Sequence, residues 1–421
     1  RATDYGLLTT DYDYGLRTTD YRLMKVYLDN SATTRVAPEV IDAMLPFYFD
    51  EIGNAQSVHS FGQRAKAAVE RARRQVAELI NAAPGEIVFV SGGTEADNLS
   101  VRGVAEAHGE HGRHIITTKI EHPAVLATCE YLEQSGFSIT YLPVSNTGRL
   151  SVDDLRAALT VDTILVSVMH ANNETGTIQP IEEIAQVVAA ARDRGAAHLQ
   201  FHSDAVQSAA KVAIDVKKLM VDLLSVSAHK LHGPKGVGAL YVRKGVRLSK
   251  LLYGGHHERD RRAGTENVPG IVGMGCAAEI ARQRFAETQA QMRKLRDHLE
   301  QQIAARVPDV RVNGDTGHRL PNISNLSFAN VDGESLLIAL DLKGIAVSTG
   351  SACASGSLEP SHVLQAMGLT REQVRGSLRF SLSAYTTRDE IDCAVSALAE
   401  TVTRLREMIP NEEWSVSKRA L

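Results

Sequence analysis

From Val26 onward, short runs of β-branched and other apolar residues alternate with stretches whose apolar positions recur at helical spacing. This alternation predicts an α/β fold in which a mostly parallel sheet is covered by helices. Helices are expected over Gly62–Asn81, Ala124–Gln134 and Ile181–Arg194, and Ser151 with Asp154 approximates the capping box of another. The seven predicted strands are Glu86–Val90, His114–Thr118, Ile139–Leu142, Thr163–Met169, His198–His202, Leu223–Val226 and Gly238–Val242.

The pattern changes in the last third of the chain. A long charged helical stretch from about Ile271 to Arg306 interrupts the alternation, and a smaller α+β unit is expected beyond Pro308. A TIM barrel would also alternate strands and helices, but eight even βα units cannot be counted here. The elements expected in the second unit are strands Val310–Asn313, Ile323–Phe328, Ile345–Ser348 and Ser377–Phe380 and helices Ser335–Leu342 and Arg388–Met408.

The first residues do not share this pattern. The segment Asp4–Thr10 recurs nine positions later, with one substitution, as Asp13–Thr19, so residues 1–23 read as a tag, a processing remnant or a short tail. They have neither the apolar core of a signal peptide nor the amphipathic, Arg-rich and acid-poor character of a transit peptide. Met24 is a plausible natural start.

Composition and charge exclude several classes of protein. The 421 residues are 43% hydrophobic, which rules out a disordered, collagen-like or small disulfide-stapled chain. The formal net charge of −4 gives no basic field for nucleic acid, and no apolar stretch approaches a membrane span. Four scattered cysteines, without a CxxC pair, predict no metal site of zinc-ribbon type and favour a reducing, cytoplasmic location.

A first candidate site lies at the predicted strand Ile87–Val90. It is followed by Ser91-Gly92-Gly93-Thr94-Glu95, which opens a helical stretch, so free backbone N–H groups there would face an anion. The pattern predicts a phosphate-binding site, although Gly-Gly between a strand and a helix is often only a tight turn.

A lysine and a carboxylate follow two other strands of the same sheet. Lys230 lies just past a buried-type strand and before a Gly-Pro turn, and burial there would suit a Schiff-base lysine. Taken alone it would more often be a solvated side chain, but Asp204 follows the strand His198–His202. Pyridoxal phosphate requires a phosphate seat, a lysine for its aldehyde and a carboxylate for its pyridine nitrogen. All three are predicted at strand ends, where open α/β sheets bind ligands.

Four more residues are candidates. His122 lies in a turn between a strand and a helix and could stack on the cofactor ring, whereas a capping histidine is the alternative. Asn173 follows another strand, where a structural turn is possible. Cys353 lies in a Ser/Gly-rich loop, unlike a buried thiol, and Arg379 could bind a carboxylate with two hydrogen bonds unless it is a surface arginine.

Taken together, these motifs resemble the cysteine desulfurases, pyridoxal-phosphate enzymes of the aminotransferase-like fold, from Met24 to about Met408. One departure is Gly254-Gly255-His256-His257-Glu258-Arg259, because family members often have a third glycine before the Glu-Arg pair. The matching stretches are Tyr27–Thr34, Ser91–Asn98, Glu121-His122, His170–Glu174, Asp204–Gln207, Ser227–Gly236, Arg262–Asn267, Gly350–Ser361 and Arg379–Ser381.

The resemblance implies a role for each matching residue. Lys230 would hold the cofactor covalently, Asp204 would bind its pyridine nitrogen, and His122 would stack on its ring. Arg379 would bind the substrate carboxylate, with Asn173 beside the ring hydroxyl and substrate, and Cys353 would be the nucleophile. The other cofactor contacts would be Gly93, Thr94, Gln207, Ser227, His229 and, from a partner subunit, Thr265.

The implied reaction converts L-cysteine to L-alanine. Lys230 would act as base and the Cys353 thiolate would take the sulfur as a persulfide. A homodimer is implied, with a sulfur-acceptor or iron–sulfur scaffold protein as partner, because the extended cysteine loop resembles the group serving iron–sulfur assembly. A selenocysteine lyase, an aminotransferase and a catalytically idle scaffold are the alternatives. The expected division is a tail (1–23), a segment joining the small domain (24–37), a cofactor-binding domain (38–270), a connecting helix (271–306) and a small domain carrying the cysteine loop (307–421).

Overall fold

The computed structural model describes residues 25–349 and 360–408. Its largest element is a seven-stranded sheet of order β2-β8-β7-β6-β5-β3-β4, in which β8 runs antiparallel to both neighbours and the other pairs are parallel. The predicted mostly parallel sheet is therefore confirmed. The strands are β2 (Ile87–Val90), β3 (His114–Thr118), β4 (Ser138–Leu142), β5 (Thr163–Ser167), β6 (Gln200–Asp204), β7 (Leu223–Ser227) and β8 (Gly238–Val242).

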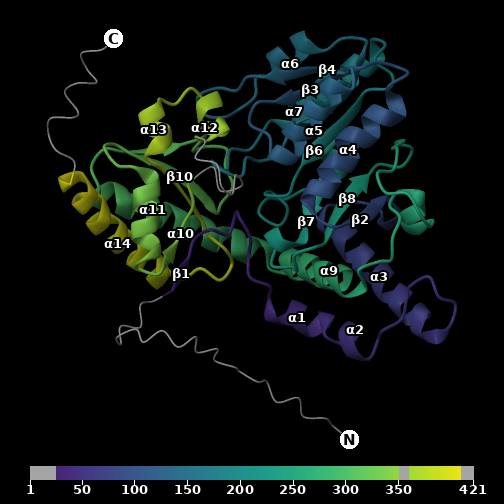
Figure 1. Cartoon of the computed structure of the whole chain (residues 1–421), viewed down its shortest axis with the longest axis horizontal. Coiled ribbons are helices and arrows are strands. Elements are labelled where there is room, and N and C mark those ends of the chain that lie inside the picture. The colour runs from purple at the N-terminus through teal and green to yellow at the C-terminus, as the bar shows by residue number, and fades with distance from the viewer. Residues whose placement is uncertain (1–24, 350–359, 409–421) are drawn as a thin grey trace, which may run out of the picture.

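Helices cover both faces of this sheet, because alternate strand residues point to opposite sides. Ile87 and Phe89 belong to one apolar core with helices α3, α7 and α9, whereas Val88 and Val90 belong to another with α4 and α5. Figure 1 shows α4 and α5 close to the strands. The helices around the sheet are α1 (Pro38–Met44), α2 (Pro46–Phe49), α3 (Ser60–Leu79), α4 (Gly93–His108), α5 (Pro123–Gln134), α6 (Val152–Ala158), α7 (Ile181–Asp193), α8 (Val216–Leu219) and α9 (Val268–Gln283).

A smaller group of elements forms its own core on the other side of the molecule (Figure 1). It contains the antiparallel sheet β12-β10-β9 and a parallel pair in which β1 joins β11, so the N-terminal segment packs with the last third of the chain. Its elements are β1 (Val26–Tyr27), α10 (Phe285–Arg306), β9 (Val310–Asn313), β10 (Ile323–Phe328), α11 (Gly333–Asp341), β11 (Ile345–Ala346), α12 (His362–Ala366), α13 (Arg371–Arg375), β12 (Ser377–Ser381) and α14 (Arg388–Glu407).

The structure has two helices where the sequence predicts a single one over 271–306. The chain leaves helical geometry at Arg284, whose φ and ψ are −99° and 12°. The apolar side chains of α9 belong to the core of the large sheet, whereas Leu295, Leu299 and Ile303 of α10 belong to the core of the smaller group. One straight helix would not direct its apolar stripe at both cores, so the break follows from packing.

One strand also begins later than predicted. Residues 196–199 form a turn after Gly195, whose φ of +116° suits glycine, and Leu199 donates its N–H to the carbonyl of Ala196. The strand predicted over His198–His202 therefore runs over Gln200–Asp204, which makes Asp204 its last residue. Within the two described ranges, we find no helix with the length and apolar character needed to cross a membrane.

Candidate active site

A cavity of about 250 Å³ lies where the strands of the large sheet end beside β12. Ten of the twelve residues selected from the sequence line this cavity, although they come from widely separated segments of the chain. They are Gly93, Thr94, His122, Asn173, Asp204, Gln207, Ser227, His229, Lys230 and Arg379.

The beginning of α4 forms one end of the cavity. A helix leaves the N–H groups of its first turn without partners inside the helix, so Gly93 and Thr94 present donors to an anion. A Cβ atom added at Gly93 would lie 2.8 Å from Cγ2 of Val206, so glycine permits this close approach. Ser227, the last residue of β7, contributes a buried hydroxyl that has no hydrogen-bond partner among the described residues.

Asp204 and His122 form the centre of the cavity. Asp204 is buried, and its Oδ1 accepts a 2.8 Å hydrogen bond from the Val206 N–H. Burial raises its pKa above the usual range, while His122 and Lys230 act in the opposite direction. His122 caps α5, because its Nδ1 accepts from the Ala124 N–H at 3.1 Å. Burial lowers the pKa of His122, so a neutral imidazole faces the Asp204 carboxylate.

Lys230 follows β7 on a short 3-10 turn, Ala228–Lys230, and its side chain lies in the cavity. Its Nζ donates to the main-chain carbonyls of Ser31 and Ala32, the latter at 2.8 Å. His229 lies next to it, with Nδ1 3.1 Å from Thr33 Oγ1. Burial and the positive charge of Lys230 lower the pKa of His229 to about 4, which leaves its ring neutral near neutral pH.

Arg379 closes the cavity from β12 of the smaller group. Its residue is 1% exposed, so the guanidinium is a buried cation. Nη2 donates to Asp29 Oδ1 at 2.8 Å, and Nη1 donates to the carbonyl of Asn173 at 3.1 Å. Its Nε has no hydrogen-bond partner among the described residues. The guanidinium therefore retains a donor for a carboxylate ligand.

Two selected residues lie elsewhere. Thr265 lines a separate cavity of about 110 Å³ with Arg262 and Glu266, and it does not line the cavity that contains Lys230. Cys353 lies outside the described residues, so its position is not part of the site geometry.

Sequence reasoning assigned no role to several residues of this site. Ser31 and Ala32 contribute main-chain oxygens, and Asp97 is a second buried carboxyl group that lines the cavity with Asp204. Burial and the charges of Asp204 and Glu121 raise the pKa of Asp97 well above its usual range. The sequence could have indicated Asp97, because it places a charged residue next to Ala96 on the apolar face of a predicted helix.

Comparisons with known proteins identify the family of the chain. The model of the aminotransferase class-V family matches residues 26–393, and the chain belongs to this family. A cysteine desulfurase of Trichormus azollae is 52% identical over 385 residues, which are 91% of this chain and 94% of the relative. The cysteine desulfurase IscS of Dictyoglomus turgidum is 48% identical over 397 residues, or 94% of this chain and 99% of the relative. A solved NifS-like protein has a TM-score of 0.85 at 41% identity, covering 90% of this chain and all of that structure.

Cysteine desulfurases of this family use pyridoxal phosphate, and the cavity has groups that fit it. The hydroxyl of Ser227 and the first turn of α4 provide donors for a phosphate, and Lys230 and Asp204 provide an amine and a buried carboxylate. These groups stand at strand ends of one sheet, in the arrangement that the sequence predicts.

Proposed function

We propose that the chain is a cysteine desulfurase, which converts L-cysteine to L-alanine and passes the sulfur to Cys353 as a persulfide. The observation that carries the proposal is the convergence of Lys230, Asp204, His122 and Arg379 on one buried cavity. Relatives named cysteine desulfurase, about 50% identical over most of the chain, support it. The same likeness supports sulfur supply for iron–sulfur cluster assembly as the biological role.

In this proposal the substrate carboxylate binds to Arg379. The buried guanidinium is held by Asp29 and the Asn173 carbonyl, so its direction is fixed before substrate arrives. The unpartnered Nε provides a charge-assisted donor, and burial strengthens its interaction with a carboxylate. Asn173 then lies beside both substrate and cofactor.

Lys230 and Asp204 prepare the substrate carbon for reaction. When bound, pyridoxal phosphate draws electrons from the α-carbon of the substrate into its ring. Asp204, buried at the end of β6, holds a proton on the pyridine nitrogen, while His122 covers the ring. Lys230, as a neutral amine, removes the α-proton, and the Ser31 and Ala32 carbonyls hold its nitrogen inside the same cavity.

The sulfur step requires the thiolate of Cys353. The thiolate attacks the substrate sulfur, a sulfur–sulfur bond forms, and the carbon–sulfur bond breaks. The electron pair of that bond remains with the substrate carbon, which takes up a proton and becomes the methyl group of alanine. The three cysteines in the described part of the chain, Cys129, Cys276 and Cys393, are free thiols, and burial raises the pKa of Cys129 to about 12, which disfavours its thiolate.

The experiment that tests the function compares two lysine variants. The purified, cofactor-loaded protein is incubated with L-cysteine, and alanine release is measured. Lys230→Ala should abolish release and borohydride-stable cofactor attachment, whereas the matched Lys235→Ala, five residues along the same loop, should retain both. Attachment to Lys235, or alanine release by Lys230→Ala at the rate of the unsubstituted protein, would contradict the proposal.

The proposal includes a homodimer in a reducing, cytoplasmic environment, with an iron–sulfur scaffold or other sulfur acceptor as a transient partner. Thr265 lies outside the Lys230 cavity of its own chain, which supports a role toward a partner subunit.

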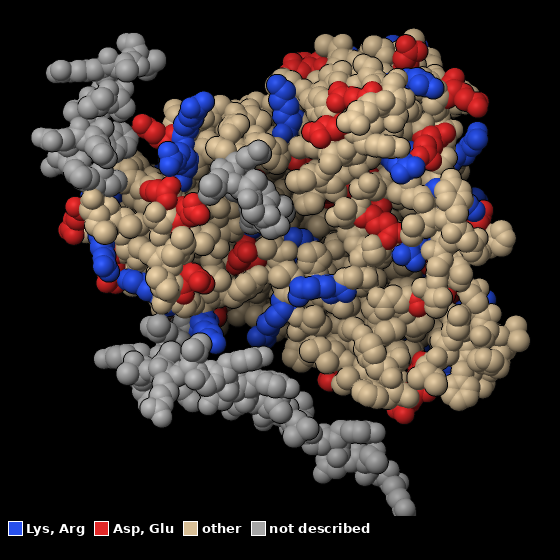
Figure 2. Space-filling view, in the orientation of Figure 1, with Lys and Arg blue, Asp and Glu red and all other residues tan. Residues whose placement is uncertain are grey.

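Apolar side chains on α2 and the following loop also support the proposed dimer, because they are unusually exposed. They include Phe49 (73%), Ile52 (70%) and Val58 (90%). Few charged groups appear on the part of Figure 2 where this segment projects. Native mass spectrometry should give twice the chain mass.

We further propose that the chain divides into two domains, with α9 in the larger one. The separate cores on either side of Arg284 support this division. The break between α9 and α10 supports a connection between the domains at that residue.

A further inference from the structure

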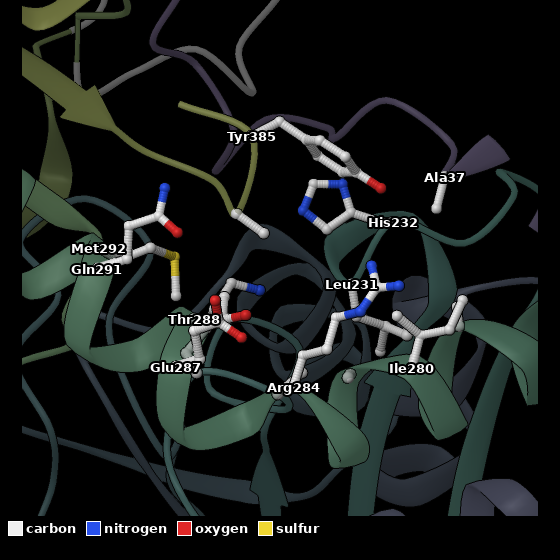
Figure 3. A pocket seen from close by; sticks show the side chains of 15 residues that line it. Ala37, Leu231, His232, Ile280, Arg284, Glu287, Thr288, Gln291, Met292 and Tyr385 are labelled. Carbon is white, nitrogen blue, oxygen red and sulfur yellow. The ribbon is translucent and has the colours of Figure 1, made fainter. Parts of the chain in front are cut away.

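A second cavity, of about 310 Å³, lies beside Lys230 where α9 meets α10. Eight of its fifteen lining residues are apolar, among them Ala37, Leu231, Ile280 and Met292. Figure 3 shows Tyr385 and His232 on one side of this cavity and Arg284 and Glu287 on the helical side. None of the residues lining it lines the candidate active site, so the two are separate spaces.

One buried cation belongs to this cavity. Lys211 is only 6% exposed, and its Nζ donates a 2.6 Å hydrogen bond to the main-chain carbonyl of Lys230. An ammonium group has three donors, so a neutral carbonyl satisfies it only in part. Burial and the charge of Lys230 lower the pKa of Lys211 to about 8, which shows how little its surroundings stabilise the charge.

Other polar groups of the cavity narrow the choice of ligand. The guanidinium of Arg284 forms an ion pair with Glu39 at 3.0 Å. The Nδ1 of His232 donates to the Arg35 carbonyl at 3.0 Å, so the Nε2 of the neutral His232 ring carries no proton. Burial and Lys211 lower the pKa of His232 to about 4, which keeps this ring neutral. Glu287 has no ion-pair partner within the described ranges, and its negative charge at the rim disfavours a dianion.

We propose that this cavity binds a small aliphatic monocarboxylate, with the carboxylate on Lys211 and the hydrocarbon part against Leu231, Ile280 and Met292. The anion would complete the hydrogen bonding of a buried ammonium group, and the apolar walls would bind a short branched chain. Lys211 also donates to the main-chain carbonyl of Lys230. The ligand and the candidate catalytic lysine would therefore be bound to the same ammonium group.

The test measures binding by isothermal titration calorimetry on the cofactor-loaded, full-length protein, with isovalerate as the probe. Saturable binding is expected, with isovaleramide, the neutral isostere, and inorganic phosphate at least about tenfold weaker. Lys211→Met should weaken isovalerate by about tenfold or more, because a charged hydrogen bond is lost, whereas the exposed Lys218→Met should leave it unchanged. Absence of saturable binding, or equal binding of isovaleramide, would overturn the proposal.

A second pair of variants covers the case in which Lys211→Met fails to fold. Ala281→Trp places a large side chain in the cavity wall and should block isovalerate, whereas Ala290→Trp on the exposed side of α10, outside this cavity, should not. Arg379→Ala distinguishes the two spaces, because it changes the candidate active site alone. Undiminished binding to Ala281→Trp, or loss of binding in Arg379→Ala, would place the probe elsewhere and refute the assignment.

Discussion

Replacing Arg379 by lysine tests the part of the site that the structure defines most closely. The guanidinium uses one N–H of Nη2 on Asp29 and one N–H of Nη1 on the Asn173 carbonyl, so three of its five N–H groups, including that of Nε, remain for a carboxylate. An ammonium group has one nitrogen and cannot reproduce this geometry. Losing one charge-assisted hydrogen bond to the carboxylate costs about 1.5–3 kcal/mol, which corresponds to a decrease in kcat/KM for L-cysteine of about 10- to 150-fold.

The assay is alanine release as a function of cysteine concentration. We expect most of the loss as a raised KM, because the carboxylate is bound similarly in the ground state and the transition state. Arg388→Lys, at an arginine whose side chain is 62% exposed, is the matched control and should leave KM unchanged. Circular dichroism and cofactor absorbance must show that both variants are folded and loaded. A folded Arg379→Lys protein with the KM of the unsubstituted protein would show that Arg379 does not bind the substrate.

Four further variants test the electrostatics of the fold and the site. Asp204→Ala should reduce alanine release far more than it reduces the unfolding temperature, because the buried carboxylate acts on the cofactor nitrogen; equal losses would indicate a structural role. Glu258→Ala should destabilise the protein by about 3–5 kcal/mol in urea unfolding, because it leaves the buried Arg73 guanidinium without its 2.7 Å partner. Glu70→Ala, which removes the more exposed partner of the same arginine, should lower the free energy of unfolding by less than about 1 kcal/mol. Similar losses of stability in the Glu258 and Glu70 variants would refute the greater importance of the buried ion pair. Burial raises the pKa of Glu121 from 4.5 to about 8, so its contribution to stability is present below pH 4.5 and is lost as the pH rises toward 8. Glu121→Gln should therefore flatten the fall of the urea midpoint across this range, and an unchanged pH profile would contradict the assignment.

The regular part of the fold could be predicted from the sequence because its signals are local. The strands His114–Thr118 and Gly238–Val242 are fully buried and begin and end where predicted. The pair formed by β1 and β11 was harder to predict, because each strand has two residues and they lie more than three hundred positions apart. The helix break at Arg284 depends on which core each apolar stripe faces, and this is a tertiary property.

The same reasoning explains what could be predicted of the candidate site. Lys230, Asp204 and Gly93 each lie at or just after the end of a strand, and the carboxyl ends of strands in one sheet lie together, so their approach to each other could be inferred. Ser31 and Ala32 act through main-chain carbonyls, which carry no signal in the side-chain sequence. Their approach to Lys230 depends on the path of the N-terminal segment across the whole molecule, which local patterns do not specify.

The position of the transferred sulfur tests the central claim most directly. The cofactor-loaded protein and its Cys353→Ser variant are incubated with L-cysteine, and peptides from both are examined by mass spectrometry. The account predicts one additional sulfur on the Cys353 peptide of the unsubstituted protein, and a variant that keeps its cofactor absorbance but releases no alanine, because a serine hydroxyl is hardly ionised near neutral pH. Sulfur found on Cys129, Cys276 or Cys393 instead, or alanine released by the variant at the unsubstituted rate, would contradict it.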